Sequence, residues 1–218
     1  MSLVLPNTFA CTSRTAVLEG ATPIDFRPFA QHGLPEELTR QLVTQRFLVT
    51  ASCARSSVSE GRYIDFTETL VKIPVHLGAQ NYLFPVITYV DHEYSLIRGF
   101  LLGFHKVFAA HPEGARSHTV SLPGLDIDLR EDEVLGGGEA EVPAEQAYPF
   151  LLWTDYSVGG ARSHGFRTLV VEQYQRESSR FLRCARRDQT VANRKATVAG
   201  LYEIEDRFVV TGTDPLDV

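Results

Sequence analysis

The chain has 218 residues, of which 44% are hydrophobic, and its formal net charge is −6. This length and composition suffice for one continuous core, so we predict a single domain over residues 1–218. The negative charge argues against a surface that binds nucleic acid or an anionic membrane electrostatically. The three cysteines have no CxxC spacing, so they favour neither a disulfide framework nor a zinc site.

Several sequence features that define other protein classes are absent. No apolar run approaches the roughly 20 residues that span a bilayer, and "MSLVLPNTFACTSRTAV" lacks the features of a signal peptide, so we expect a cytoplasmic protein. The sequence contains no GxGxxG, GxxxxGK[ST], HExxH or GxSxG motif. It therefore gives no support for dinucleotide binding, a P-loop, a zinc protease or a serine hydrolase, and we expect no cofactor or metal.

In chain order, the first predicted element is a short helix. Residues 1–33 contain several turn formers and read as an irregular lead-in with at most one strand. In residues 34–45, Pro35 stands in the first turn, two glutamates follow, and Leu38 and Leu42 share one face. This pattern predicts a short amphipathic helix.

Beyond this helix the sequence is rich in β-branched and aromatic residues with a period of two. We predict a turn with one helical turn over 91–99 and an acidic, glycine-rich loop over 130–146. The predicted strands are 46–52, 69–77, 82–90, 101–109, 117–130, 148–156, 165–176, 180–187, 195–203 and 206–212. Many short strands with few helices indicate an α+β fold, mostly antiparallel β, in which a curled sheet forms a barrel or sandwich.

Lys106 lies in the apolar segment "LLGFHKVFAA" (101–110). On a strand, Phe104 and Phe108 would flank Lys106 on one face, and His105 would point to the other. Burial there can lower the pKa of a lysine by up to about 3–5 units, which leaves free amine at neutral pH. A free amine can attack a ketone or aldehyde and form an imine. The alternative is a lysine that extends from a sheet edge into solvent.

The pentapeptide "GARSH" occurs twice, at 114–118 and 160–164. One interpretation is coincidence, because a single five-residue match does not make a repeat protein. The other is two similar loops, each with an arginine and a histidine, at the mouth of one cavity.

The segment "YVDHEYSLIRGFLLGFHKVFA" (89–109) resembles the signature of the acetoacetate decarboxylase superfamily. In that signature a Tyr-x-Asp strand, a turn and a Gly-Phe-Pro-Lys-Lys strand carry the imine-forming lysine. Upstream, "TETLVKIPVHLGAQNYLFPVITYVD" (67–91) is similar to the Thr-Glu segment of the family and the strands after it. The resemblance implies a curled sheet or barrel of the acetoacetate decarboxylase-like type with a few short helices. It also implies no cofactor, a small carbonyl or keto-acid substrate, and a homo-oligomer, dimer or larger.

Carried over by position, the resemblance implies that Lys106 forms the imine and that Glu68 orients the substrate or shuttles protons. The alternative for Glu68 is a surface residue at a strand edge. The sequence departs from the motif at His105, in place of proline, and at Val107, in place of the second lysine. Activation would then come from burial of Lys106, helped by a partly charged His105. Leu48 stands near the place where a second acidic residue is expected.

We also predict four substrate-binding residues, namely Arg98, Phe104, His105 and Phe108. Arg98 could hold a substrate carboxylate through a bidentate contact, or form an ion pair with Glu93 or Asp91. The function that the resemblance implies is an imine-forming lyase acting by decarboxylation or by aldol and dehydration chemistry. Two alternatives stay open: a catalytically silent relative that binds a small ligand, and an imine-free cyclase or dehydratase using Glu68 and histidines.

Overall fold

The computed structural model describes residues 5–110, 119–122, 124–128, 142–158, 160–182 and 188–217. Strands dominate these residues. They are β1 (Asn7–Asp25), β2 (Val43–Ser59), β3 (Arg62–Leu77), β4 (Gln80–Val90), β5 (Lys106–Phe108), β6 (Thr119–Leu122), β7 (Leu125–Asp128), β8 (Leu151–Val158), β9 (Ala161–Leu182), β10 (Asp188–Val191) and β11 (Arg194–Pro215). The helices are α1 (Glu36–Gln41) and α2 (Glu93–Leu102), with the short 3₁₀ turns η1 (Arg27–Phe29) and η2 (Ala144–Ala147). Neither of these two α-helices is long and apolar enough to cross a membrane.

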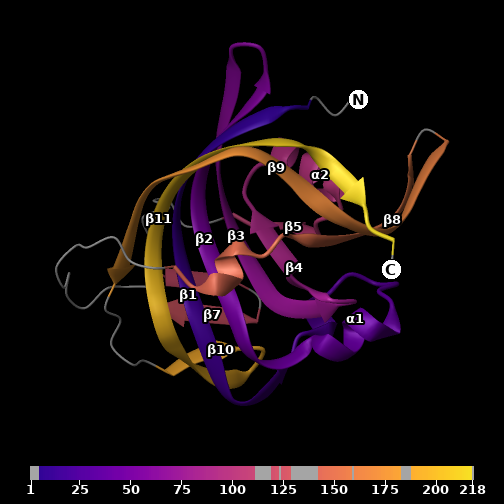
Figure 1. The fold of residues 1–218 in the computed structure, drawn as a ribbon. Helices are drawn as coiled ribbons and strands as arrows, with labels where there is room; N and C mark the ends of the chain where they lie inside the picture. Colours follow the sequence, from indigo (N-terminus) through magenta and orange to yellow (C-terminus); the bar gives the residue numbers. More distant parts are fainter. Residues whose placement is uncertain are drawn as a thin grey trace.

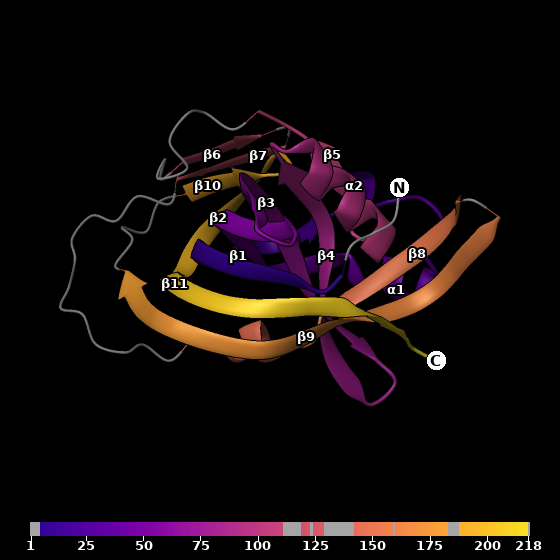
Figure 2. The same ribbon diagram turned by 90° about the horizontal axis from the view of Figure 1, so that it is seen from above.

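The strands form one curled, mostly antiparallel sheet (Figure 1). Its main path runs β5-β4-β3-β2-β1-β11-β10-β7-β6, and β9 pairs with both β11 and β8. Seen from above, β9 and β11 arch along one side while α2 and β5 lie on the other (Figure 2). A parallel bridge between Leu83 and Phe150 brings the region of β8 back to β4. The predicted fold class is confirmed.

Strands β1 to β4 carry different residues on their two faces, because successive side chains alternate. One face, here called the core face, packs the main hydrophobic cluster, which includes Phe47, Val49, Val71, Ile73 and Val75. The opposite face, here called the Glu68 face, carries two smaller clusters, Val17–Leu48–Leu83 and Ala54–Phe66–Val90. Between these clusters lies a polar band of Ser13, Thr15, Thr50, Ser52 and Glu68, in which neighbouring hydroxyls hydrogen-bond at 2.8 Å. The candidate site lies on this band.

The N-terminal prediction was wrong in part. The first 33 residues, predicted as an irregular lead-in with at most one strand, contain the 19-residue strand β1. Its polar residues obscure the period of two, because Ser13 and Thr15 belong to the polar band rather than to solvent. The helix predicted over 34–45 forms only over Glu36–Gln41.

The predicted strand over 101–109 was also wrong in part. Helix α2 extends to Leu102, whereas the prediction for 91–99 was a turn with one helical turn, and β5 comprises only Lys106–Phe108. The apolar residues of α2 include a buried Leu102 and resemble a strand in composition. Further along, the strand predicted at 165–176 and the first residues of the one predicted at 180–187, up to Leu182, belong to one strand, β9, and residues 183–187 lie outside the described residues. The strands predicted at 195–203 and 206–212 are one strand, β11.

Candidate active site

A β-α-β unit positions Lys106. Strand β4 leads into α2, whose first turn is capped by His92 through a hydrogen bond from the Tyr94 N–H to Nδ1 (3.1 Å). The helix ends at Gly103, whose φ of +102° is in the left-handed region that favours glycine. The chain then returns as β5, parallel to β4, with Lys106 opposite Thr88. A parallel pair needs such a crossover, and here it places α2 beside the lysine.

The Lys106 amine lies between a carboxylate and a hydroxyl. Its Nζ donates to Glu68 Oε2 at 2.9 Å and to Ser95 Oγ at 3.1 Å. The Lys106 side chain is 8% exposed and that of Glu68 is 20% exposed, so the carboxylate is on the more open side of the pair. Three separate elements, β3, α2 and β5, therefore meet at one nitrogen.

Gly99 makes room for the Lys106 side chain. A Cβ at position 99 would lie 2.2 Å from Lys106 Cε and 2.4 Å from Cδ, so any larger residue overlaps the lysine. Gly99 is buried on α2, one turn beyond Ser95. The side chain of Lys106 thus runs across the helix to reach Glu68.

Two aromatic rings border the Lys106 amine. Its Nζ is 5.7 Å from the ring centroid of Phe104 and 5.9 Å from that of Phe66. Phe108, predicted as the second flanking ring, is instead 53% exposed. The difference follows from the short β5, because Phe104 lies before the strand and Phe66 comes from β3. A role for Phe108 in binding substrate stays a prediction.

His105 faces away from the amine. Its electrostatic neighbours are Val86, Phe29 and His32, and Val86 and Phe29 belong to the core-face cluster. Burial lowers the pKa of His105, while hydrogen bonds to backbone groups of Val86 and Phe29 partly counter this effect. The predicted help from a partly charged His105 is therefore not supported, because the ring lies on the other side of the sheet and its burial disfavours the charged form.

Arg98 is a buried cation on α2. It is 4% exposed, and its Nη1 donates to Ser56 Oγ (3.0 Å) and to the Ser57 carbonyl (3.4 Å). The guanidinium carbon lies 4.8 Å from the ring centroid of Phe9. Burial lowers the pKa of Arg98, and the charge of Glu68 acts against this. The ion pair with Glu93 or Asp91 does not form, so the guanidinium has no carboxylate partner within the described residues.

Sequence reasoning missed two charged groups of this region, Lys72 and Asp206. Lys72 lies on β3, four residues after Glu68. Burial lowers the pKa of Lys72 to about 7, while the charges of Asp206 and Glu68 act to raise it. Asp206 lies on β11, and burial raises its pKa. One Asp206 oxygen accepts from Tyr174 at 3.2 Å, and the other, Oδ1, is buried without a described partner. The period-two pattern of β3 contains a signal for Lys72, because it places that lysine on the same face as Glu68.

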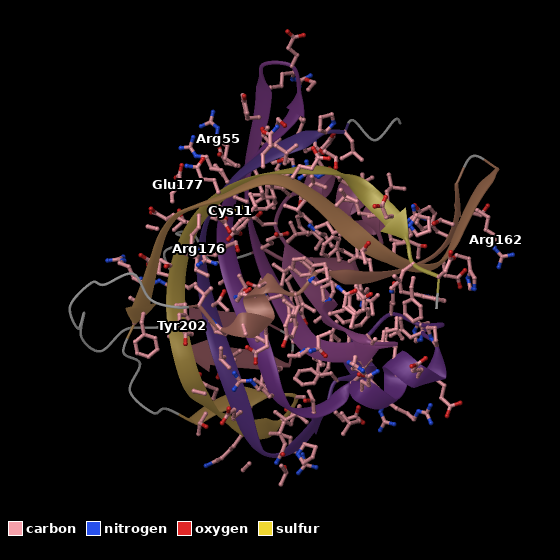
Figure 3. All side chains as sticks on the ribbon, viewed as in Figure 1. Cys11, Arg55, Arg162, Arg176, Glu177 and Tyr202 are labelled. Atoms are coloured by element: carbon pink, nitrogen blue, oxygen red, sulfur yellow. The ribbon has the colours of Figure 1, made fainter. Side chains whose placement is uncertain are left out.

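A hollow of about 600 Å³ lies near the amine but is not the Lys106 site. It borders Phe66 and Asp206 and does not include Lys106 or Glu68. Asp65 and Thr67, which also line it, alternate with Phe66 and Glu68 along β3 and so point to the other face of the sheet. Arg55 lies opposite Asp65 on β2 and points to that same face. In Figure 3, Arg55 extends to the periphery of the molecule.

The second "GARSH" segment, residues 160–164, lies in the hairpin of β8 and β9 and not at Lys106. Arg162 extends from the projecting part of this hairpin (Figure 3). His164 hydrogen-bonds Asp155 at 3.1 Å and contacts the Trp153 ring. The first copy, residues 114–118, lies outside the described residues.

Comparison with solved structures identifies the fold. The enduracididine biosynthesis enzyme MppR, with HEPES buffer bound, aligns with a TM-score of 0.67 at 14% identity, covering 98% of this chain and 88% of that one. An acetoacetate decarboxylase-like enzyme from Sphingomonas wittichii RW1 aligns with a TM-score of 0.62 at 14% identity, covering 99% and 95%. The acetoacetate decarboxylase of Legionella pneumophila aligns with a TM-score of 0.61 at 12% identity, covering 100% and 90%.

The chain has the acetoacetate decarboxylase-like fold. This confirms the fold that the sequence resemblance implied, and each of these three neighbours is an enzyme. No protein-family model and no curated protein sequence matches the chain. A shared fold does not define a reaction, so the chemistry has to be argued from the site itself.

Proposed function

We propose that the chain is a lyase that forms an imine between Lys106 and the carbonyl carbon of a keto acid or related carbonyl compound. The observation that carries the proposal is the buried Lys106 Nζ, held 2.9 Å from Glu68 Oε2 beside Ser95. A nucleophile at hydrogen-bond distance from a base is one of the arrangements that support covalent catalysis. The neighbouring folds supply support by analogy, since MppR has been solved with pyruvate bound.

In the proposed first half-reaction, Glu68 accepts a proton from the Lys106 ammonium and frees its lone pair. The amine attacks the carbonyl carbon, a C–N bond forms as the C=O π bond breaks, and the attacking nitrogen gives one of its protons to the carbonyl oxygen, which yields a neutral carbinolamine. Glu68 then returns a proton to that hydroxyl, which leaves as water, and a protonated imine remains. Ser95 Oγ, 3.1 Å from the nitrogen, keeps the side chain in place through these steps.

The protonated imine can then accept an electron pair from the neighbouring carbon. If a carboxylate in the β position leaves as carbon dioxide, the electrons of its C–C bond form an enamine, which is decarboxylation. If the α-carbon instead gives a proton to the Glu68 carboxylate, an enamine also forms. Its carbon can attack an aldehyde, whose oxygen takes up the proton from Glu68, and loss of water from this aldol is the dehydration. An MppR structure that contains a condensation product of pyruvate and imidazole 4-carboxaldehyde supports the second route by analogy.

Arg98 is the proposed partner for a substrate carboxylate next to the reacting carbonyl. It follows Ser95 by one helical turn and has no described carboxylate partner of its own. A guanidinium can form two parallel hydrogen bonds to a carboxylate. The homo-oligomeric state and the cytoplasmic location stay predictions from the sequence.

The test is imine trapping, with the intact mass of the protein measured after incubation with pyruvate or acetoacetate and borohydride. Wild type should gain the mass of one reduced adduct, peptide mapping should place it at Lys106, and Lys106→Ala should gain none. Glu68→Gln should form the adduct about 100-fold more slowly, because the base that frees the amine is lost. Lys195→Met, which changes an exposed lysine on β11, is the matched control.

The alternatives give different results in the same experiment. A silent ligand-binding relative gives no adduct with any of a broad panel of keto acids. An imine-free cyclase or dehydratase keeps its activity in Lys106→Ala and loses it in Glu68→Gln. No described histidine hydrogen-bonds Glu68, so this last function would depend on the carboxylate alone within the described residues.

A further inference from the structure

Lys72 is a second buried lysine on the Glu68 face. It is 4% exposed, and its Nζ donates to Gln146 Oε1 at 3.2 Å. Within the described residues no carboxylate lies at ion-pair distance from this nitrogen, and the amide of Gln146 carries no charge. A buried ammonium usually has a carboxylate partner, because an unpaired charge is costly to remove from water. Lys72 is therefore either a neutral amine or a cation whose partner would be an anionic ligand.

The surroundings of Lys72 are apolar on one side and covered by η2 on the other. Leu48 lies opposite it on β2 and belongs to the cluster that Tyr148, Phe150 and Tyr202 extend. The acidic residue of η2, Glu145, is already engaged by Arg46 at 2.7 Å. Gln146, which accepts from the Lys72 nitrogen, is only partly buried. An anion that replaced the Gln146 oxygen would meet the lysine directly.

A pair of aromatic rings connects Lys72 with Lys106. Lys72 Nζ lies 5.9 Å from the ring centroid of Phe150, and the rings of Phe150 and Phe104 have centroids 5.9 Å apart. Lys106 Nζ in turn lies 5.7 Å from the centroid of Phe104. The two phenylalanines thus form an apolar surface with one lysine amine at each end. A ligand with a carbonyl at one end and an anion at the other matches this order of groups.

We propose that Lys72 binds the carboxylate of an oxo acid whose carbonyl carbon reacts at Lys106, with the intervening apolar carbons lying along Phe104 and Phe150. This inference rests on the proposed imine function and names a class of substrate for it. The carboxylate takes the place of Gln146 Oε1 on the Lys72 nitrogen. An α-keto acid such as pyruvate is too short for this, because its carboxylate is attached to the reacting carbon.

The first experiment compares oxo acids with methyl ketones of equal length. The proteins are wild type, Lys72→Met and the control Lys195→Met. Each is incubated with an oxo acid, namely pyruvate, 5-oxohexanoate, 6-oxoheptanoate or 7-oxooctanoate, and then with borohydride. The last three acids are compared with the ketones of equal length, 2-hexanone, 2-heptanone and 2-octanone. Wild type should label at least about tenfold more readily with one of the longer oxo acids than with its ketone. Lys72→Met should lose that preference, and its labelling by pyruvate is the reference for imine formation in this variant. An unaltered preference in Lys72→Met overturns the proposal.

The second experiment needs no imine. Hexanoate, heptanoate and octanoate lack the carbonyl, and their binding is measured by calorimetry at pH 8 in HEPES and in Tris. Because burial lowers the pKa of Lys72 to about 7, most of it is neutral at this pH, and a bound carboxylate should restore the proton. Wild type should take up close to one proton per ligand, and Lys72→Met should take up none. If the wild type does not bind these acids, or if both proteins take up the same number of protons, the proposal is wrong.

The two experiments separate the proposals. If no compound labels wild type, the imine function fails, and the calorimetry still decides whether Lys72 holds a carboxylate. If pyruvate labels Lys106 but the preference for longer oxo acids is absent, the imine function stands and the assignment of Lys72 fails.

Discussion

The two ends of the Phe104–Phe150 pair place similar amines in different electrostatic settings. Both lysines are buried on the Glu68 face and both lie near an aromatic ring. Lys106 has a carboxylate and a hydroxyl at hydrogen-bond distance, whereas Lys72 has one neutral amide. Burial of an amine without a carboxylate partner favours loss of its proton, as the lowered pKa of Lys72 shows. This difference is what the two proposals rest on, namely reaction at Lys106 and recognition of an anion at Lys72.

The largest expected effect in this comparison comes from moving the Lys106 amine away from Glu68. Gly99→Ala places a Cβ 2.2 Å from Lys106 Cε, and the lysine must move because its side chain is more flexible than the helix. The rate of imine trapping should fall about 100-fold, as expected for a reacting group displaced by about 1 Å. The rate of adduct formation by mass spectrometry measures this.

The control for this variant is Ile97→Ala, which changes an exposed residue of the same helix. The fold of Gly99→Ala should persist, since alanine favours a helix over glycine by about 1 kcal/mol. A trapping rate within threefold of wild type, with the melting temperature unchanged, would show that the Lys106 side chain does not need the space above Gly99.

The next effect concerns stability at the Lys72 end. The pKa of Lys72 is about 7 in the folded protein and 10.5 ordinarily, so between these values the unfolded chain binds more protons. The free energy of unfolding should therefore rise with pH across this window, by about 1 kcal/mol per pH unit from this group. Lys72→Met lacks this contribution, and it should be more stable than wild type at pH 7 by a margin that shrinks towards pH 10.

Urea unfolding at pH 7, 8, 9 and 10 measures the change. Lys195→Met should follow the wild-type pH dependence, because that lysine is exposed. If wild type and Lys72→Met differed by the same amount at every pH, the Lys72 amine would not be desolvated as described. An opposite trend, with the margin growing as the pH rises, would indicate a hidden anionic partner.

The sequence pointed to the pair Lys106 and Glu68, which the structure brings together, but not to Lys72. Lys106 was identifiable because a lone lysine interrupts an apolar run, and the resemblance of two motifs in order pointed to Glu68. Lys72 and Asp206 were missed because their surroundings depend on the curled sheet. In the sequence, Lys72 is one polar residue in an alternating strand, and Asp206 lies in the acidic run "YEIEDRF", which resembles a solvated face. Strand β1 pairs with β2 on one side and with β11 on the other, and the register of these two pairings places Lys72 and Asp206 on the same face of the sheet, the Glu68 face.

At the boundary between α2 and β5 the sequence predicted the wrong kind of element, although the local signals for the right one were present. Leucine, phenylalanine and glycine in "GFLLGFHKVF" fit a strand by composition, yet the residues up to Leu102 form a helix. Two local signals were present, namely His92 at the helix start and Gly103 at its end. They were outweighed by the apolar content, because a short buried helix and a buried strand have similar composition. As a result, the sequence named Phe108 instead of Phe66 as the second ring beside the amine.

The smallest expected effects come from replacing the aromatic rings near Lys106. A ring near a partly desolvated ammonium contributes about 0.5–2 kcal/mol, so Phe104→Ala and Phe66→Ala should each lower the extent of imine trapping about three- to tenfold. Phe108 is 53% exposed, so Phe108→Ala should change it less than twofold, as should Phe181→Ala, which alters an exposed ring on β9. Imine trapping with pyruvate at several concentrations measures these differences between the variants. If Phe108→Ala lost as much as Phe104→Ala, the flanking pair predicted from the sequence would be the correct one, and Lys106 would have to turn towards the exposed end of β5 when substrate binds.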